Sequence, residues 1–141
     1  MAPGCFLDTN VLLYAVSVAP AEHAKRERAR ELLQDDDWTL SIQVLQEFFV
    51  QATRTSRVQH LSAAEARGLI DCWSRFTVQA ITWEVLQRAL DLRDTYPLSY
   101  WDAAILAAAE ESSCNLLFSE DLSDGGCYGG VRVCNPFRGL P

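Results

Sequence analysis

Short apolar runs alternate along this chain with longer stretches in which apolar residues recur at helical spacing. Runs typical of buried strands cover residues 4–8, 38–41, 77–81, 115–119 and 131–133. Helical spacing and helix-start residues predict helices over residues 10–17, 22–34, 42–54, 62–75, 83–96 and 99–112. Strands separated by helices in this way predict an α/β fold with three layers, in which helices flank a mostly parallel central sheet.

Several boundaries of these elements carry capping and turn residues. Ser62 and Glu65 have the spacing of a capping box, and Pro97 stops the helix that Thr82 caps. Residues 124–126, Asp-Gly-Gly, predict a turn before the last strand. No repeat, low-complexity segment or linker interrupts the pattern, so we expect a single domain over residues 1–141.

The composition is that of a soluble globular protein, because 49% of the residues are apolar and only 22% are charged. No apolar stretch reaches the roughly 18 residues of a membrane span, and the first four residues lack the basic region of a secretory signal. We therefore expect a cytoplasmic protein with no membrane partner. The five cysteines are scattered without a Cys-x-x-Cys pair, which favours reduced and mostly buried thiols over a zinc site.

The net charge of −7 is not the usual profile of a protein that binds nucleic acid by bulk electrostatics. A nucleic-acid substrate would need local basic residues and metal ions to overcome this field. Arg54 and Arg57 lie at the end of the helix expected over residues 42–54 and just beyond it, where they could reach a phosphate backbone. A solvated surface also explains these two arginines.

Two acids closely follow apolar strands of the predicted sheet. Asp8 ends the first strand, and Asp121 comes shortly after the strand at residues 115–119. Ligands of open α/β sheets bind beyond the carboxyl ends of the strands, so we expect both acids at that edge. Each acid has a second explanation, because Asp8 can cap the helix that follows it and Asp121 fits a turn.

A third acid, Asp102, lies on the helix expected over residues 99–112. It shares a face with Ile105, Leu106 and Ala109, where a carboxylate without a cationic partner is costly to bury. A capping box with Ser99 also explains an acid at this position. A functional role and a capping role therefore compete for the same side chain.

A fourth acid, Glu47, has the weakest support from the pattern. It projects away from the centre of the apolar stripe formed by Leu45, Phe48, Phe49 and Ala52. Periodicity alone therefore favours a solvated side chain for Glu47.

Four segments, taken together and in order, resemble the PIN-domain nucleases, and specifically the VapC-type toxins of bacterial toxin–antitoxin pairs. The segments are FLDTNVLLY at residues 6–14, SIQVLQEF at 41–48, SYWDAAI at 99–105 and LFSEDL at 117–122. The first segment alone is a weak signal, whereas all four in order, spread over most of the chain, are specific. The resemblance implies a PIN-like version of the predicted fold.

The resemblance also implies residue roles. The candidate catalytic acids are Asp8, Glu47, Asp102 and Asp121. Three of them are implied as metal ligands, namely Asp8, Asp102 and Asp121, and three neighbours as accessory residues, namely Thr9, Asn10 and Ser119. An all-oxygen ligand set suits Mg²⁺ or Mn²⁺ as the cofactor.

The implied activity is hydrolysis of phosphodiester bonds in single-stranded or loop RNA. The family further implies a homodimer and a cognate antitoxin whose tail covers the acidic site. Val50, Trp73 and Trp83 mark the surface where we expect the dimer contact.

Other readings compete with this one. An aspartyl-phosphate phosphatase needs a second acid two residues after the first, and Asn10 stands there. Metal-free cleavage through the RNA 2′-hydroxyl would need a pair of catalytic side chains, either two histidines or a histidine and a lysine. His23 and His60 lie in no acid-rich context, so this mechanism is not favoured. A non-catalytic PIN-like module that binds RNA or protein stays open, as does DNA as the substrate.

Overall fold

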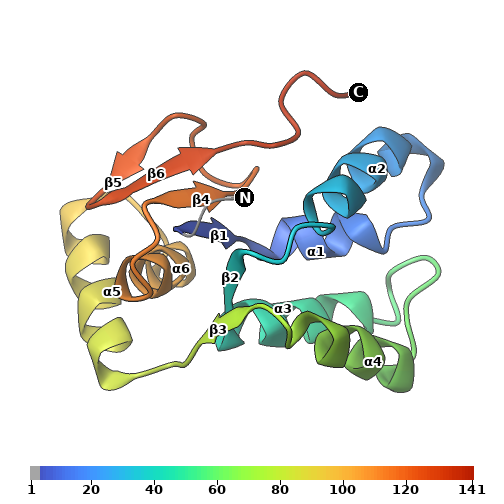
Figure 1. Cartoon of the computed structure of the whole chain (residues 1–141), viewed down its shortest axis with the longest axis horizontal. Helices are drawn as coiled ribbons and strands as arrows, with labels where there is room; N and C mark the ends of the chain where they lie inside the picture. Colours follow the sequence, from blue (N-terminus) through green and yellow to red (C-terminus); the bar gives the residue numbers. More distant parts are fainter. Residues whose placement is uncertain (1–3) are drawn as a thin grey trace.

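The computed structural model describes residues 4–141, which form a six-stranded sheet in the order β3-β2-β1-β4-β6-β5 (Figure 1). The strands are β1 (Cys5–Leu7), β2 (Trp38–Ser41), β3 (Thr77–Gln79), β4 (Leu116–Phe118), β5 (Cys127–Tyr128) and β6 (Val131–Cys134). Neighbouring strands pair in parallel except β5, which is antiparallel to β6. The predicted mostly parallel α/β sheet is therefore confirmed.

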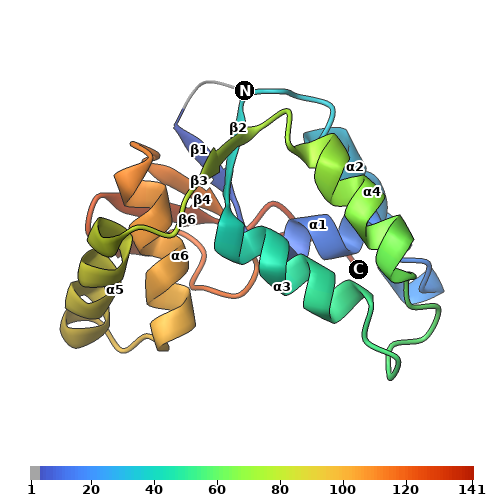
Figure 2. The same ribbon diagram turned by 90° about the horizontal axis from the view of Figure 1, so that it is seen from below.

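Helices lie on both sides of this sheet (Figures 1 and 2). They are α1 (Thr9–Ala15), a 3-10 turn η1 (Pro20–Glu22), α2 (His23–Leu32), α3 (Ile42–Ala52), α4 (Ala63–Trp73), α5 (Trp83–Thr95) and α6 (Tyr100–Glu111). The pair α5 and α6 packs on one side, and α6 contacts four strands, whereas α1 packs against α2 and α3. This arrangement is the predicted three-layer architecture.

The expected strands and helices are all present, with ends that differ by a few residues. Ser62 and Glu65 form the predicted capping box, and Thr82 accepts a hydrogen bond from the backbone N–H of Val85 at the start of α5. Strand β5 is not predicted, because two residues beside the turn at 124–126 are too few to show a periodicity.

Two predictions about individual side chains are wrong. Trp73 cannot contact a partner subunit, because it is only 4% exposed and packs edge-on against Phe48 with ring centroids 4.7 Å apart. The cysteines are not mostly buried, since Cys72 and Cys127 are exposed while Cys5 and Cys114 are buried. Between residues 4 and 141, all five thiols are free.

The prediction about a secretory signal rests partly on residues 1–3, which lie outside the described residues. Over the described part of the chain, every helix is too short or too polar to cross a membrane.

The pairing register of β1 and β4 brings Asp8 and Ser119 together at the carboxyl edge of the sheet. Strand β1 pairs with β4 so that Leu7 lies beside Phe118, and both are buried. The next residue of each strand, Asp8 and Ser119, therefore emerges at the same point of the carboxyl edge. The backbone N–H of Asp8 extends the ladder by donating to the carbonyl of Phe118 at 3.0 Å.

Candidate active site

Asp8 joins β1 to α1 and is almost completely enclosed, with 5% of its surface exposed. The backbone N–H of Thr9 donates to its Oδ1 at 2.7 Å, and the Ser119 hydroxyl donates to its Oδ2 at 2.7 Å. Burial raises the pKa of Asp8 to about 7, against the lowering effect of these two bonds, and the charges of Asp121 and Glu47 raise it further. Asp8 is thus the predicted helix cap, but capping does not require this burial.

Ser119 links three of the predicted site residues through its hydroxyl. Besides donating to Asp8, this oxygen accepts hydrogen bonds from Asn10 Nδ2 at 3.3 Å and from the backbone N–H of Asp121 at 3.1 Å. Ser119 is fully buried, and within residues 4–141 the Oδ1 of Asn10 is a buried side-chain oxygen without a hydrogen-bond partner. The site therefore contains an unused acceptor beside Ser119, which is bonded to the buried carboxylate.

Glu47 is half-buried on α3 and accepts a hydrogen bond on Oε1 from the Thr9 hydroxyl at 3.0 Å. The solvated position favoured by periodicity is incorrect because the buried face of α3 is rotated from the expected one. Phe49 is 36% exposed, whereas Gln43 and Val44 are buried. Burial raises the pKa of Glu47, the Thr9 and Gln43 side chains lower it, and the charges of Asp102 and Asp121 raise it again.

Asp102 is half-buried at the start of α6, a helix whose residues 103–109 are all buried. The Ser99 hydroxyl accepts from the backbone N–H of Asp102 at 3.1 Å, which is one of the two bonds of the alternative capping box. Burial raises the pKa of Asp102, the Ser99 side chain lowers it, and the charge of Asp121 adds to the increase. The carboxylate thus lies close enough to Asp121 to interact with its charge.

Asp121 is exposed in the turn after β4, and its backbone bond to Ser119 is the local turn chemistry expected there. Its charge nevertheless raises the pKa of each of the other three acids. The structure therefore brings the four predicted acids into one electrostatic group. Among residues 4–141, no three Asp, Glu, His or Cys side chains stand close enough together to hold a metal ion as they are placed.

The donor chemistry of this group fits a hard divalent cation. All four acids offer carboxylate oxygens, which are the ligands that Mg²⁺ and Mn²⁺ prefer. A cation would relieve the repulsion that raises the pKa of Asp8, Glu47 and Asp102, and the unused Oδ1 of Asn10 is an additional oxygen beside Ser119. The resemblance to PIN-domain nucleases implies Asp8, Asp102 and Asp121 as the residues that would hold the ion.

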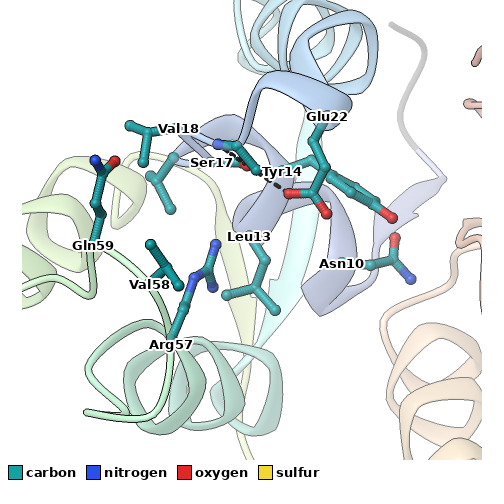
Figure 3. A pocket seen from close by; sticks show the side chains of 11 residues that line it. Asn10, Leu13, Tyr14, Ser17, Val18, Glu22, Arg57, Val58 and Gln59 are labelled. Atoms are coloured by element: carbon teal, nitrogen blue, oxygen red, sulfur yellow. Dashed lines mark hydrogen bonds between the residues drawn. The ribbon is translucent and has the colours of Figure 1, made fainter.

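The two predicted arginines occupy different hollows. Arg57 lines a cavity of about 360 Å³ between α1 and the segment after α3, together with Asn10 and Leu13 (Figure 3). Arg54 lines a second hollow together with Glu47. Neither arginine forms an ion pair with another residue of the described chain, so both keep their positive charge available.

The residues that hold the turn after β4 were not predicted from the sequence. Lys25 Nζ pairs with Glu120 Oε2 at 2.9 Å, and the Tyr14 hydroxyl donates to Glu120 Oε1. Glu120 thus ties the segment containing Ser119 and Asp121 to α1 and α2. The sequence offered one indication of this role, because Glu120 stands between Ser119 and Asp121. Its partners, Lys25 and Tyr14, are distant in sequence and could not be predicted.

Solved structures with the same fold cover nearly the whole chain. A toxin–antitoxin complex from Klebsiella pneumoniae is 22% identical with a TM-score of 0.69, covering 94% of this chain and 97% of that chain. The sarcin–ricin loop cleaving toxin VapC20 of Mycobacterium tuberculosis is 21% identical with a TM-score of 0.67, covering 91% and 98%. DNA-bound VapBC from Salmonella typhimurium is 18% identical with a TM-score of 0.66, covering 94% and 97%.

At these identities the structural likeness concerns the fold. No curated protein matches the sequence significantly. The family model of the PIN domain matches residues 5–123, a range that contains all four acids and therefore the whole proposed site. The chain belongs to the PIN domain family.

Proposed function

We propose that this chain is a metal-dependent endoribonuclease and the toxin of a VapBC-type toxin–antitoxin module, built as a single domain. The observation that carries the proposal is the electrostatic coupling of Asp8, Glu47, Asp102 and Asp121 at the carboxyl edge of the sheet. Such coupling of one buried, two half-buried and one exposed acid is costly in a fold, and it is typical of a functional site.

Each acid of the site has a proposed role in phosphodiester hydrolysis. A bound Mg²⁺ or Mn²⁺ would lower the pKa of a water molecule and neutralise charge on the phosphate. Asp8, Asp102 and Asp121 would hold the cation, and Ser119 fixes the orientation of the Asp8 carboxylate through its bond to Oδ2. Glu47, which accepts a hydrogen bond from Thr9 on Oε1, would complete the metal shell or orient the attacking water.

The proposed substrate is single-stranded or loop RNA. Its backbone is accessible and its bases are splayed, so it enters an open acidic groove more easily than a duplex does. The likeness to a toxin that cleaves the sarcin–ricin loop supports this choice. Arg54 and Arg57, both unpaired within residues 4–141, are the proposed phosphate contacts.

The proposed partners are a cognate antitoxin and a second copy of the chain, in the cytoplasm. The support for the antitoxin is the likeness to toxin–antitoxin complexes. An acidic groove is also a natural receptor for an arginine side chain, which binds carboxylates through two parallel hydrogen bonds.

A second candidate is a non-catalytic module that binds RNA or protein. One observation favours it: among the described residues, no three acids stand close enough to hold a metal ion as placed. A module of this kind would bind RNA without cutting it at any metal concentration.

Incubation of the purified chain with total bacterial RNA, in Mg²⁺, in Mn²⁺ and in EDTA, separates the two candidates. The proposed nuclease gives discrete fragments with either metal and none in EDTA. Cleavage of an RNA target is then compared with cleavage of its 2′-deoxy counterpart of the same sequence. This comparison distinguishes RNA from DNA as the substrate. Intact RNA in every metal, with the fold verified by circular dichroism, would support the binding module instead.

A further inference from the structure

Trp101 is exposed directly beside the acidic group. It precedes Asp102 at the start of α6, and 63% of its surface is accessible, which is unusual for the largest apolar side chain. The ring borders a hollow of about 290 Å³ that Glu47 and Arg54 also line. A site acid, an unpaired cation and an exposed aromatic ring therefore share one concave surface.

The position of Trp101 is fixed from two sides. The side chain of Gln43, which is 8% exposed on α3, donates from Nε2 to the Trp101 carbonyl at 3.1 Å. The ring of Tyr100 meets the Trp101 ring edge-on, with centroids 5.1 Å apart. The hydrogen bond holds the backbone of Trp101 and the Tyr100 ring packs against its side chain, which reduces the conformational freedom that the Trp101 ring loses when a ligand stacks on it.

The lining of the hollow matches the chemistry of an unpaired nucleobase. A base stacks on an aromatic face, and its edge forms hydrogen bonds with side-chain amides such as those of the exposed Gln46 and Gln51. Arg54 supplies a cation for a neighbouring phosphate. The volume is near the lower end of the range for small-molecule sites, about 300–1,000 Å³, which suits one nucleotide.

The net charge of the chain makes stacking the more valuable source of affinity. With a charge of −7, the protein as a whole repels a polyanion. Stacking on Trp101 does not depend on charge, so it contributes to RNA binding without opposing this field.

We propose that Trp101 is the stacking platform of a subsite for an unpaired base flanking the phosphodiester to be cut, with Gln46 reading the base edge and Arg54 contacting the phosphate. This proposal rests on the proposed ribonuclease function. It makes Trp101 a residue that determines which bases can lie beside the acidic group.

A second copy of this chain is the competing occupant of the surface. Trp83 and Ile81, which are 67% and 58% exposed, line an adjoining hollow. This hollow shares Gln43, Gln46 and Trp101 with the first. A base is favoured over a second copy in the hollow that Trp101 shares with Glu47 and Arg54. A contact between two copies there would bury these two charges without partners, which is costly.

Fluorescence anisotropy of a labelled random-sequence RNA oligonucleotide tests the subsite in the inactive Asp8→Asn background. Trp101→Ala should weaken binding about 5- to 150-fold, the range for losing one stacked base, while Trp101→Phe should recover most of the affinity. Leu90→Ala, which shortens another exposed apolar side chain, is the control and should change affinity less than twofold. Arg54→Gln should instead reduce the salt slope by about 1, an effect that Trp101→Ala does not share.

Cleavage assays and mass measurements complete the test. Trp101→Ala in the otherwise wild-type chain should lower kcat/KM by a similar factor and alter the sequence at the cut sites. Wild-type cleavage with unchanged Trp101→Ala kinetics overturns the subsite alone, whereas an inert wild type overturns the ribonuclease proposal itself. Loss of dimer mass in both Trp101→Ala and Trp83→Ala, with RNA affinity unchanged, would assign the surface to the second copy.

Discussion

At the scale of single residues, the site is defined by a carboxylate that the fold buries at an energetic cost. Asp8 receives hydrogen bonds from Thr9 and Ser119, yet burial raises its pKa to about 7. The sequence predicted this acid at the sheet edge because it follows an apolar strand. It could not predict how deeply Asp8 is buried, because that depends on Ser119, which is 111 positions away.

The raised pKa of Asp8 predicts how stability depends on pH without metal. Since the ordinary value of 3.8 rises to about 7, the folded protein binds more protons than the unfolded chain between these values. The free energy of unfolding should therefore fall as pH increases from about 4 to about 7. Asp8→Asn removes this loss, so the variant should melt several degrees higher than the wild type at pH 8, and at a similar temperature at pH 4.

Melting curves in EDTA across this pH range check the prediction. Parallel curves for the two proteins would show that Asp8 carries no such cost. Addition of Mg²⁺ at pH 8 should raise the melting temperature of the wild type and leave Asp8→Asn nearly unchanged, because the ion binds the folded carboxylates.

The Ser119 hydroxyl makes a separate prediction. Ser119→Ala removes the donor to Asp8 and leaves Asn10 Nδ2 and the Asp121 N–H without their acceptor. The loss of buried partners should destabilise the protein by about 1–3 kcal/mol. Urea unfolding measures this change, and Ser112→Ala, which removes a partly buried hydroxyl outside the site, provides the comparison.

At the scale of elements, the acids come from the ends of β1 and β4 and from the helices α3 and α6. Periodicity located these elements because each is long or apolar enough to show a pattern. Periodicity placed Glu47 on the wrong face of α3, because a polar residue such as Gln43 does not count toward an apolar stripe. In the structure Gln43 is nevertheless buried and donates a hydrogen bond to the Trp101 carbonyl. The resemblance to PIN-domain nucleases implies a site role for Glu47, which periodicity alone does not.

The turn after β4 is held by an ion pair between elements, which makes α2 part of the support of the site. Lys25→Met breaks the bond to Glu120 and frees the segment that carries Ser119 and Asp121. We expect the Mg²⁺ concentration for half-maximal cleavage to rise severalfold, with little change in kcat at saturating Mg²⁺. Lys25→Arg should restore the wild-type value.

Arg26→Gln is the control for this experiment, because Arg26 pairs with its neighbour Glu27 and not with the turn. An unchanged Mg²⁺ requirement in Lys25→Met would mean that the turn keeps its position without the ion pair. The pair is about one quarter exposed, so its effect on global stability should be small.

At the scale of the whole molecule, an acidic protein is proposed to bind an acidic polymer. The net charge predicts that a nucleic-acid substrate needs local basic residues and metal ions to overcome the negative field, and Arg54 and Arg57 are the proposed basic residues. The family resemblance implies a dimer and an antitoxin as partners.

This distribution of charge predicts a weak dependence of RNA binding on salt. Two phosphate contacts give a slope of log K against log salt of roughly −1 to −2 for a single strand. Anisotropy titrations of Asp8→Asn between low and physiological salt measure the slope. A slope steeper than about −4 would mean that more basic residues than Arg54 and Arg57 contact the RNA.

The most direct test of the account is RNA cleavage by four single variants, Asp8→Asn, Glu47→Gln, Asp102→Asn and Asp121→Asn. Asp91→Asn, an exposed acid on α5, is the matched control. If the four acids form one metal-dependent site, each variant should lose at least about 100-fold in kcat while remaining folded, and the control should keep wild-type activity. Wild-type rates in any of the four, with the fold intact, would remove that acid from the site, and wild-type rates in all four would contradict the account.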